Sequence, residues 1–242
     1  MSPPGLLFVA SRISDPSKTT DAQFNKMYNE EHLPDVLNYK TKITDLALRY
    51  KNTNTSSSSE RPYLALYTLE DAASFFASGT LQQLTEDTKH SASYGGQNIT
   101  DFVHFDARPY EKIQTFEGPG HHDGNNAGKE DRARTITCVA MEPARGAEAE
   151  ADFEAWYRKQ HLDMMAMCKG YRRSTRYKRL DGVEPRYLAL HEWDCKPADL
   201  PKEQVEQVKQ TEWSRKILAE ARVFDRDVFE LIEVQGDLGR EL

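Results

Sequence analysis

The chain has 242 residues, of which 38% are hydrophobic and 29% charged, a balance typical of a soluble globular protein with one large domain or two small ones. A net charge of −7 and an isoelectric point near 5.6 exclude the broad basic face that a nucleic-acid partner requires. The three cysteines are not spaced like metal ligands, and their odd number fits a reducing compartment. The apolar run near the N-terminus is too short for a signal peptide or a membrane span. We therefore expect a cytoplasmic protein.

The first half of the chain predicts elements in the order strand, helix, strand, strand, helix, strand. Runs with strand-like composition mark the strands, at residues 5–12, 46–51, 63–69 and 110–116. The first helix begins at Asp21, because aromatic and apolar residues then recur at helical spacing through Tyr28 and His32. A second helix is expected over 72–88.

The middle of the chain, residues 118–133, is rich in Gly, Asn and charged residues and has no apolar periodicity, so it predicts a mobile linker. His121 and His122 lie in this linker, but no third ligand follows at a fixed spacing, and no metal site is predicted. A polar run at 53–60 in the first half is likewise expected to be a mobile loop tip.

The second half predicts the same order of elements. Its strands are expected at residues 134–142, 174–178, 187–193 and 228–234. Its first helix is expected to start near Asp152, and its second helix covers 201–222, just after a proline.

Matching residues indicate that the two halves are tandem copies of one unit. The matched pairs include Phe24 with Phe153, Tyr28 with Tyr157, His32 with His161, Arg49 with Arg176, and Tyr63 with Tyr187. The spacing between partners shrinks stepwise along the chain, as loops of different length between fixed elements require. We therefore predict copies at 5–117 and 134–236, joined by the linker at 118–133.

Each copy has the βαββαβ order of a ferredoxin-like unit. Its four-stranded sheet carries helices on one face and leaves the other face bare. Two copies in one chain can bury these bare faces against each other. The expected fold is therefore α+β, with two tandem ferredoxin-like repeats that form a single barrel.

Strand alternation assigns side chains to faces. Along the strand 187–193, Leu188 and Leu190 share one face, and Tyr187, Ala189, His191 and Trp193 share the other. In the first copy, Tyr63, Ala65 and Tyr67 occupy the face that corresponds to the second set. We expect the leucine face to pack under the helices and the aromatic face to line a ligand cavity in the barrel.

Three features resemble the EthD-like branch of the dimeric α+β barrel superfamily. They are the Tyr-x-x-x-His-Leu motif of the first helix in each copy, the Thr-Glu-Trp-Ser run at 211–214 before an amphipathic helix, and the βαββαβ order. The resemblance covers both copies and implies a fused pseudo-dimer, present as a monomer or a homodimer. Asp163 replaces the proline after His-Leu in the second copy and Met27 replaces the tryptophan in the first, so the halves have diverged. The number of active pockets stays open between one and two.

The resemblance also implies a class of ligand and of reaction. Members of this superfamily bind hydrophobic small molecules, often polyketides or aromatics. Their reactions include decarboxylation, dehydration, ring closure and cofactor-free oxygenation, and some related barrels use haem. The expected partner is therefore a hydrophobic small-molecule substrate.

Four side chains are candidates for catalysis. A histidine transfers protons near neutral pH, because its unperturbed pKa is about 6.5. His191 is the preferred acid–base group, since alternation places it on the aromatic face, and Tyr67 at the matching position could polarise a substrate carbonyl. His32 and His161 are the repeat-matched candidates. For both, a structural role in which the ring bonds a backbone carbonyl stays open.

Six further side chains are candidate substrate contacts: Tyr63, Tyr187, Trp193, Tyr28, Arg49 and Arg176. For the two arginines the alternative is a salt bridge within the sheet. The sequence contains no GxGxxG, GxxxxGK[ST], GxSxG or HExxH motif. These absences argue against nucleotide binding, a serine nucleophile and a zinc protease, so no cofactor is predicted.

The sequence thus favours a cofactor-independent enzyme of secondary metabolism that performs acid–base chemistry on an apolar substrate held in the barrel. The reaction would be that of a lyase, dehydratase, decarboxylase or cyclase. One alternative is a cofactor-free or haem-dependent monooxygenase on the same fold. Another is a non-catalytic ligand-binding or stress-response barrel. The residues do not specify the substrate.

Overall fold

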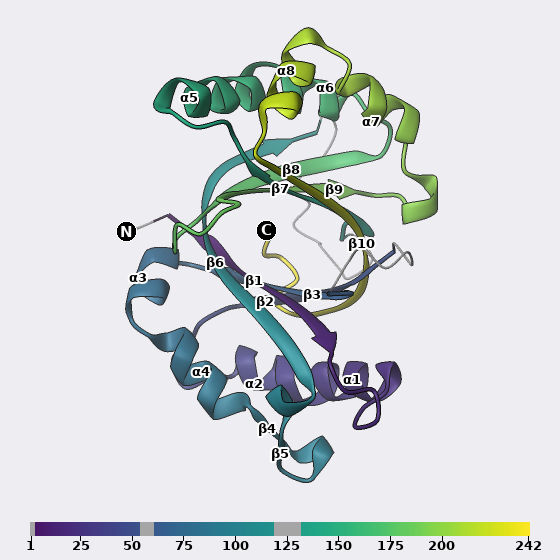
Figure 1. Ribbon diagram of the computed structural model, residues 1–242. Coiled ribbons are helices and arrows are strands. Elements are labelled where there is room, and N and C mark those ends of the chain that lie inside the picture. The colour runs from purple at the N-terminus through teal and green to yellow at the C-terminus, as the bar shows by residue number, and fades with distance from the viewer. Residues whose placement is uncertain (1–2, 54–60, 119–131) are drawn as a thin grey trace. The chain divides into compact units, whose positions relative to one another are not determined.

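Figure 1 shows the computed structural model, which describes residues 3–53, 61–118 and 132–242. Most of the predicted linker, with His121 and His122, and most of the predicted loop tip lie outside the described residues. The chain forms two compact units. Unit 1 comprises Met1–Glu111 and Leu231–Leu242, and unit 2 comprises Lys112–Glu230.

Unit 1 is built on an antiparallel sheet with the strand order β6-β1-β3-β2. These strands are β1 (Gly5–Ile13), β2 (Leu46–Asn52), β3 (Tyr63–Leu69) and the first part of β6 (Val103–Glu117). The helical elements are α1 (Asp21–Met27), the π-helical turn η1 (Tyr28–His32), α2 (Leu33–Leu37), α3 (Ala72–Ala77) and α4 (Thr80–Thr88). The helices lie on one face of this sheet, as the ferredoxin-like order requires (Figure 1).

Four short elements follow α4 and precede β6 in unit 1. They are β4 (His90–Ser91), the 3₁₀ turn η2 (Ala92–Tyr94), β5 (Gln97–Asn98) and the 3₁₀ turn η3 (Ile99–Asp101). Strands β4 and β5 pair with each other in a separate hairpin. In unit 2 the chain passes almost directly from its last helix into its last strand, so this insert is specific to unit 1.

Unit 2 repeats the plan with the strand order β10-β7-β9-β8. Its strands are β7 (Thr135–Glu142), β8 (Tyr171–Arg179), β9 (Tyr187–Trp193) and the first part of β10 (Val223–Gly236). Its helical elements are α5 (Ala147–Trp156), the π-helical turn η5 (Tyr157–His161), α6 (Leu162–Ala166), the 3₁₀ turn η6 (Pro197–Asp199), α7 (Lys202–Val208) and α8 (Glu212–Glu220). Both copies thus carry a π-helical turn at the Tyr-x-x-x-His motif.

The fold is α+β, with the strand order β1-β3-β2-β10-β7-β9-β8-β6 in a closed antiparallel barrel, as predicted. Strands β6 and β10 each contribute residues to both units, because the unit boundaries fall within them. Tyr67 pairs in register with Leu7 and Ala47, and His191 pairs with Thr137 and Ser174. Tyr67 and His191 therefore hold equivalent positions in the two sheets.

The prediction that the leucine face packs under the helices is wrong. In unit 1 the ring of Tyr63 lies 5.0 Å from that of Phe24 on α1, and in unit 2 the ring of Tyr187 lies 5.0 Å from that of Phe153 on α5. The aromatic face is the one that the helices cover. Alternation shows which side chains share a face, but not which face meets the helices.

Local signals explain where the helices begin and break. Thr20 and Gln23 form a capping box that starts α1 at Asp21, as predicted. The single helix expected over 72–88 is broken at Gly79, whose φ of 70° lies in the left-handed region. The helix expected over 201–222 is likewise broken, because Thr211 caps a new helix at the backbone N–H of Ser214. The helix expected near Asp152 begins earlier, at Ala147.

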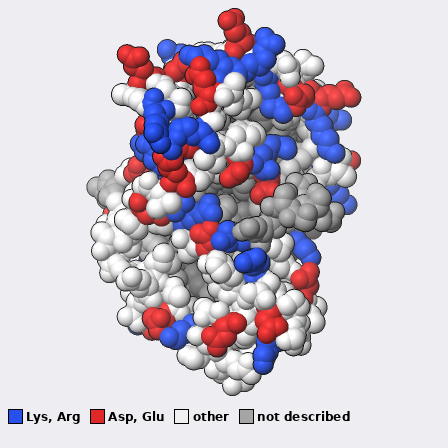
Figure 2. All heavy atoms as spheres, viewed as in Figure 1, with Lys and Arg blue, Asp and Glu red and all other residues white. Residues whose placement is uncertain are grey.

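Acidic and basic side chains are intermixed over the face of the molecule in Figure 2. Exposed pairs of this kind include Lys40–Asp87 at 2.7 Å and Lys216–Asp152 at 2.8 Å. Such surface pairs contribute little stability, typically about 0–1 kcal/mol each. The stability of each unit therefore comes mainly from its buried apolar and aromatic side chains.

Candidate functional site

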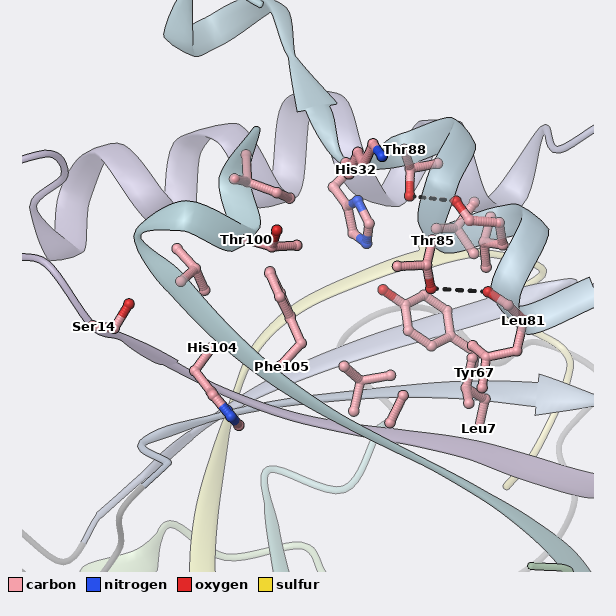
Figure 3. Close-up of a pocket in the computed structure, with 17 residues that line it drawn as sticks. Leu7, Ser14, His32, Tyr67, Leu81, Thr85, Thr88, Thr100, His104 and Phe105 are labelled. Carbon is pink, nitrogen blue, oxygen red and sulfur yellow. Dashed lines mark hydrogen bonds between the residues drawn. The ribbon is translucent and has the colours of Figure 1, made fainter. Parts of the chain in front are cut away.

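A cavity of about 360 Å³ lies within unit 1, between the sheet and the helices that cover it (Figure 3). Strands β1, β3 and β6 supply its floor, and η1, α2, α4 and η3 supply the opposite wall. Most of the lining is apolar, including Leu7, Val9, Val36, Leu84 and Phe105. This size and lining are typical of a pocket for a small hydrophobic molecule.

Most polar groups of this cavity already have partners. The hydroxyls of Thr85, Thr88 and Thr100 donate to Leu81 O, Leu84 O and Asn98 Oδ1 at 2.8 to 2.9 Å. Lys89 is paired with Glu86. Ser14 and His104 lie at an exposed edge of the cavity. The polar groups best placed for a ligand within it are therefore His32 and Tyr67.

His32 reaches the cavity from the π-helical turn η1, and its ring points into the space above Tyr67 (Figure 3). The wide turn is closed by the Leu33 N–H, which donates to Tyr28 O, and it holds the rings of Tyr28 and His32 4.7 Å apart. Such turns are frequent at functional sites. Burial, followed by the positive charge of Arg49, lowers the pKa of His32 to about 4, and Glu31 opposes this shift. The imidazole is therefore neutral, and able to accept a proton, at neutral pH.

Tyr67 stands on β3 and its hydroxyl lies 3.1 Å from that of Tyr28. The residue is 1% exposed, and burial raises its pKa well above 10. The phenol therefore stays protonated and can donate a hydrogen bond to a ligand oxygen. His32 and Tyr67 together offer a neutral base and a neutral donor within one apolar cavity.

Arg49 lies behind this pair rather than in the cavity lining. Its guanidinium donates to Asn29 Oδ1 at 2.5 Å and to Asn25 Oδ1 at 2.9 Å, and its Cζ lies 4.2 Å from the centre of the Tyr28 ring. The side chain is 1% exposed. Tyr63 packs against Phe24 beside it and is also outside the lining.

The corresponding cavity of unit 2 measures only about 40 Å³. Trp156 occupies the position that Met27 has in unit 1, and its ring stacks on His161 with centroids 4.2 Å apart. His161 and His191 line this small space together, with ring centroids 6.0 Å apart. Trp193 also lines it and donates from Nε1 to Thr137 Oγ1 at 3.2 Å. The structure thus brings His161, His191 and Trp193 together, but leaves little room beside them.

Both histidines of unit 2 are deeply buried. His191 is 2% exposed, its Nδ1 lies 2.6 Å from Ser174 Oγ, and burial lowers its pKa to about 3. His161 has a pKa well below its ordinary value for the same reason, and its Nδ1 has no hydrogen-bond partner among the described residues. No hydrogen bond from His32 or His161 to a backbone carbonyl is present within the described part of the chain. The assignment of His191 as the acid–base group stays a prediction.

The other predicted contact residues of unit 2 belong to polar networks under its helices. Arg176 donates to both carboxylate oxygens of Glu154 at 2.6 and 3.1 Å, and to Gln114 Oε1 at 2.9 Å. Tyr187 donates to Glu150. These two side chains lie outside the small cavity.

The insert between α4 and β6 is the part of the site that the sequence interpretation missed. Ile99 and Thr100 from η3 line the cavity of unit 1. The carboxylate of Glu31, next to His32, holds the insert through Ser91 Oγ, Ala92 N and the N and Oγ of Ser93 at 2.6 to 3.0 Å. The shrinking spacing between matched residues was the available signal, because it requires extra residues in the first copy.

Among the described residues, no group of three or more His, Cys, Asp or Glu side chains could hold a metal ion. The helices of the same residues are too short or too polar to span a membrane.

Comparison with known proteins identifies a relative. No protein-family model matches the chain. Core atranone cluster (CAC) protein 1 of Stachybotrys chlorohalonatus (strain IBT 40285) is 31% identical over 218 residues, which are 83% of this chain and 86% of that protein. The chain belongs to the family of this protein.

Solved structures share the fold at low sequence identity. An anthrone oxidase-like protein superposes with a TM-score of 0.58 at 13% identity, over 98% of this chain and 95% of its own. A variant of chlorite dismutase from Candidatus Nitrospira defluvii gives 0.60 at 10% identity, over 96% and 92%. These likenesses show the dimeric α+β barrel fold that the sequence resemblance implied. The EthD-like branch stays a prediction.

Proposed function

We propose that the unit 1 cavity is the active site of a cofactor-independent enzyme of secondary metabolism that removes a proton from an apolar small molecule. The observation that carries this proposal is the pairing of His32 with Tyr67 in a cavity whose other enclosed polar groups are already bonded. The name of the relative places that protein in the atranone cluster, and we propose metabolism of this kind for the present chain as well.

The proposed reaction begins at a carbon next to a carbonyl group. The neutral imidazole of His32 takes a proton from that carbon, and the electron pair of the broken C–H bond moves toward the carbonyl oxygen. The hydroxyl of Tyr67 donates a hydrogen bond to this oxygen as it becomes negative. The surrounding apolar walls lower the local dielectric constant, which strengthens both interactions.

The resulting enolate has two outcomes in the proposed reaction class. It expels a group from the next carbon, as in a lyase or dehydratase, or it attacks a second electrophilic carbon, as in a cyclase. In both cases the imidazolium of His32 then returns its proton to the leaving group or to the product. No redox partner is required for either step.

Hydrogen–deuterium exchange tests this proposal without knowledge of the natural substrate. The protein is incubated in D₂O with a panel of enolisable cyclic ketones such as 2-tetralone, and deuterium at the carbon next to the carbonyl is measured by mass spectrometry. We expect exchange above the buffer rate for ketones that fit the cavity, and a loss of about 10²-fold or more in His32→Gln.

The competing assignment is tested in the same assay. His191→Gln should keep the exchange rate, because His191 lies in the small cavity of unit 2. Loss of exchange in His191→Gln but not in His32→Gln would move the chemistry to unit 2. Ketones that bind without any exchange would favour a binding protein, and consumption of O₂ by the bound ketone would favour an oxygenase.

A further inference from the structure

A buried arginine stacks on the motif tyrosine in both units. In unit 1 the Cζ of Arg49 lies 4.2 Å from the centre of the Tyr28 ring, and in unit 2 the Cζ of Arg176 lies 3.9 Å from that of Tyr157. Each arginine is 1% exposed. The two units therefore bury the same cation on the same aromatic face.

The groups that neutralise the two cations differ. Arg176 forms a bidentate ion pair with Glu154, whereas the position that corresponds to Glu154 in unit 1 is Asn25. Arg49 donates only to the amide oxygens of Asn25 and Asn29, and no salt bridge to it is present among the described residues. Glu233 on β10 is the carboxylate whose charge acts on Arg49 electrostatically.

The charge of Arg49 is thus less compensated than that of Arg176, at a depth where charges interact strongly. An unpaired cation inside a protein is costly, and unit 2 shows that this fold accommodates a carboxylate beside it. Because unit 1 lacks that carboxylate, the positive charge of Arg49 acts on the aromatic ring stacked against it, which is that of Tyr28.

Tyr28 connects this field to the cavity. Its hydroxyl lies 3.1 Å from that of Tyr67, which lines the cavity on the floor opposite His32 (Figure 3). Burial raises the pKa of Tyr28, and the hydrogen bond with Tyr67 and then the charge of Arg49 oppose this rise, so the charge of Arg49 makes the hydroxyl a stronger donor than burial alone would leave it. In unit 2 the hydroxyl of Tyr157 instead donates weakly to Met141 Sδ at 3.7 Å, and His191 replaces the second tyrosine.

We propose that Arg49 is a positioning residue that acts through the Tyr28 and Tyr67 hydroxyls to stabilise the anionic oxygen of an enol or phenol bound in the unit 1 cavity. Tyr28 donates to the oxygen of Tyr67, and Tyr67 donates to the ligand. The ligand class is therefore an apolar molecule with one acidic hydroxyl or enolisable carbonyl. The proposal rests on the proposed function for the location of the substrate.

The compound 2-naphthol is a suitable probe, because its anion absorbs at longer wavelength than its neutral form. Its pKa is measured by absorbance, free and bound to the intact protein. The ionisable groups around the cavity are His32, His104, Glu31, Lys89, Arg49, Glu233 and the three tyrosines Tyr28, Tyr63 and Tyr67. The titration of naphthol is followed at pH values above the pKa of His32, so that the imidazole stays neutral throughout. We expect the wild-type protein to lower the pKa of the bound naphthol.

The decisive variant is Asn25→Glu, which places the carboxylate of unit 2 beside Arg49. We expect it to raise the pKa of bound naphthol by about one unit, which is about tenfold less anion at a given pH. Asn25→Asp supplies the same charge on a shorter side chain if the glutamate variant does not fold. Ala22→Glu adds one negative charge to the exposed side of α1 and should leave the pKa unchanged.

The outcomes separate this proposal from the proposed function. An unchanged naphthol pKa in folded Asn25→Glu, or an equal shift in Ala22→Glu, would overturn the role of Arg49. Absence of naphthol binding would also overturn it. Stabilised naphtholate without any deuterium exchange of ketones would support the anion site while contradicting the enzyme that we propose.

Discussion

Unit 1 and unit 2 share the βαββαβ order and the motif helix, yet they differ in the space beside the motif histidine. The cavity measures about 360 Å³ in unit 1 and about 40 Å³ in unit 2. Two features accompany this difference: Trp156 stacks over His161, where unit 1 has Met27 at the matching position, and the insert of unit 1 adds Ile99 and Thr100 to the cavity lining. A motif histidine is therefore an indication of a site only when its neighbours leave room beside it.

The two units also differ in the partners of their buried polar side chains. Unit 2 pairs its arginine with Glu154 and its central histidine with Ser174. Unit 1 surrounds its arginine with amides and presents a tyrosine to the cavity. Unit 2 thus gives Arg176 and His191 partners within the protein, whereas unit 1 presents His32 and Tyr67 to the cavity.

The largest expected effect comes from emptying the filled cavity. Trp156→Ala should lower the free energy of unfolding by about 3–5 kcal/mol, because a fully buried indole is removed and the space cannot fully collapse. Thermal or urea denaturation measures this loss. The same variant should bind a second equivalent of 2-naphthol in calorimetry, with the wild type binding one. A stoichiometry that stays at one would show that room alone does not distinguish the units.

A smaller effect is expected when the hydroxyl of Tyr67 is removed. Tyr67→Phe should reduce deuterium exchange by about 10²-fold, since it removes a donor to the developing oxygen anion. Tyr157→Phe, which removes a buried hydroxyl that contacts Met141 Sδ in unit 2, is the control. Equal losses in both variants would contradict the assignment of chemistry to unit 1.

The smallest expected effect is a decrease in the free energy of unfolding at low pH. Burial lowers the pKa of His191 to about 3, from about 6.5 in the unfolded chain. Between these values the unfolded state binds a proton that the folded state does not, so stability is highest above pH 6.5 and falls as the pH decreases. The slope is at most about 1.4 kcal/mol per pH unit for each such histidine.

Unit 2 holds two of these deeply buried histidines, so denaturation between about pH 7 and 5 should be flatter in His191→Gln than in the wild type. That window lies above the ordinary pKa values of carboxylates, which therefore contribute little to it. The exchange reaction of unit 1 should persist to lower pH, because the pKa of His32 is about 4. A deuterium-exchange rate that falls near pH 6.5 would instead indicate a histidine that is in contact with water and has its ordinary pKa.

The sequence was sufficient for the order of elements, because the alternating strands and the matched pairs such as Tyr63 with Tyr187 depend only on spacing. It was insufficient for the side of the sheet on which these tyrosines lie. Alternation is symmetric between the two faces, and only the contact with Phe24 and Phe153 resolves it. The breaks at Gly79 and Thr211 were readable in principle, from a glycine and a capping threonine.

For the site, the sequence named His32, Tyr67 and His191 and preferred His191, because strand alternation places it on the aromatic face. Alternation does not show how much space lies beside a side chain. The capping box of Thr20 and Gln23 could be interpreted locally, whereas the stacking of Trp156 on His161, which fills the space in unit 2, depends on tertiary packing.

The π-helical turn at Tyr28–His32 has a consequence for how this family can tolerate changes in length. A turn closed from residue i to i+5 contains one residue more than an α-helical turn. Deletion of a single residue between Tyr28 and His32 would replace the wide turn by a regular α-helical turn and shorten the spacing of the two side chains from four residues to three. The two rings would then lose the relative placement that now holds their centroids 4.7 Å apart. Deletions in this segment are therefore expected to be rarer than substitutions, and the wide turn is itself part of the site.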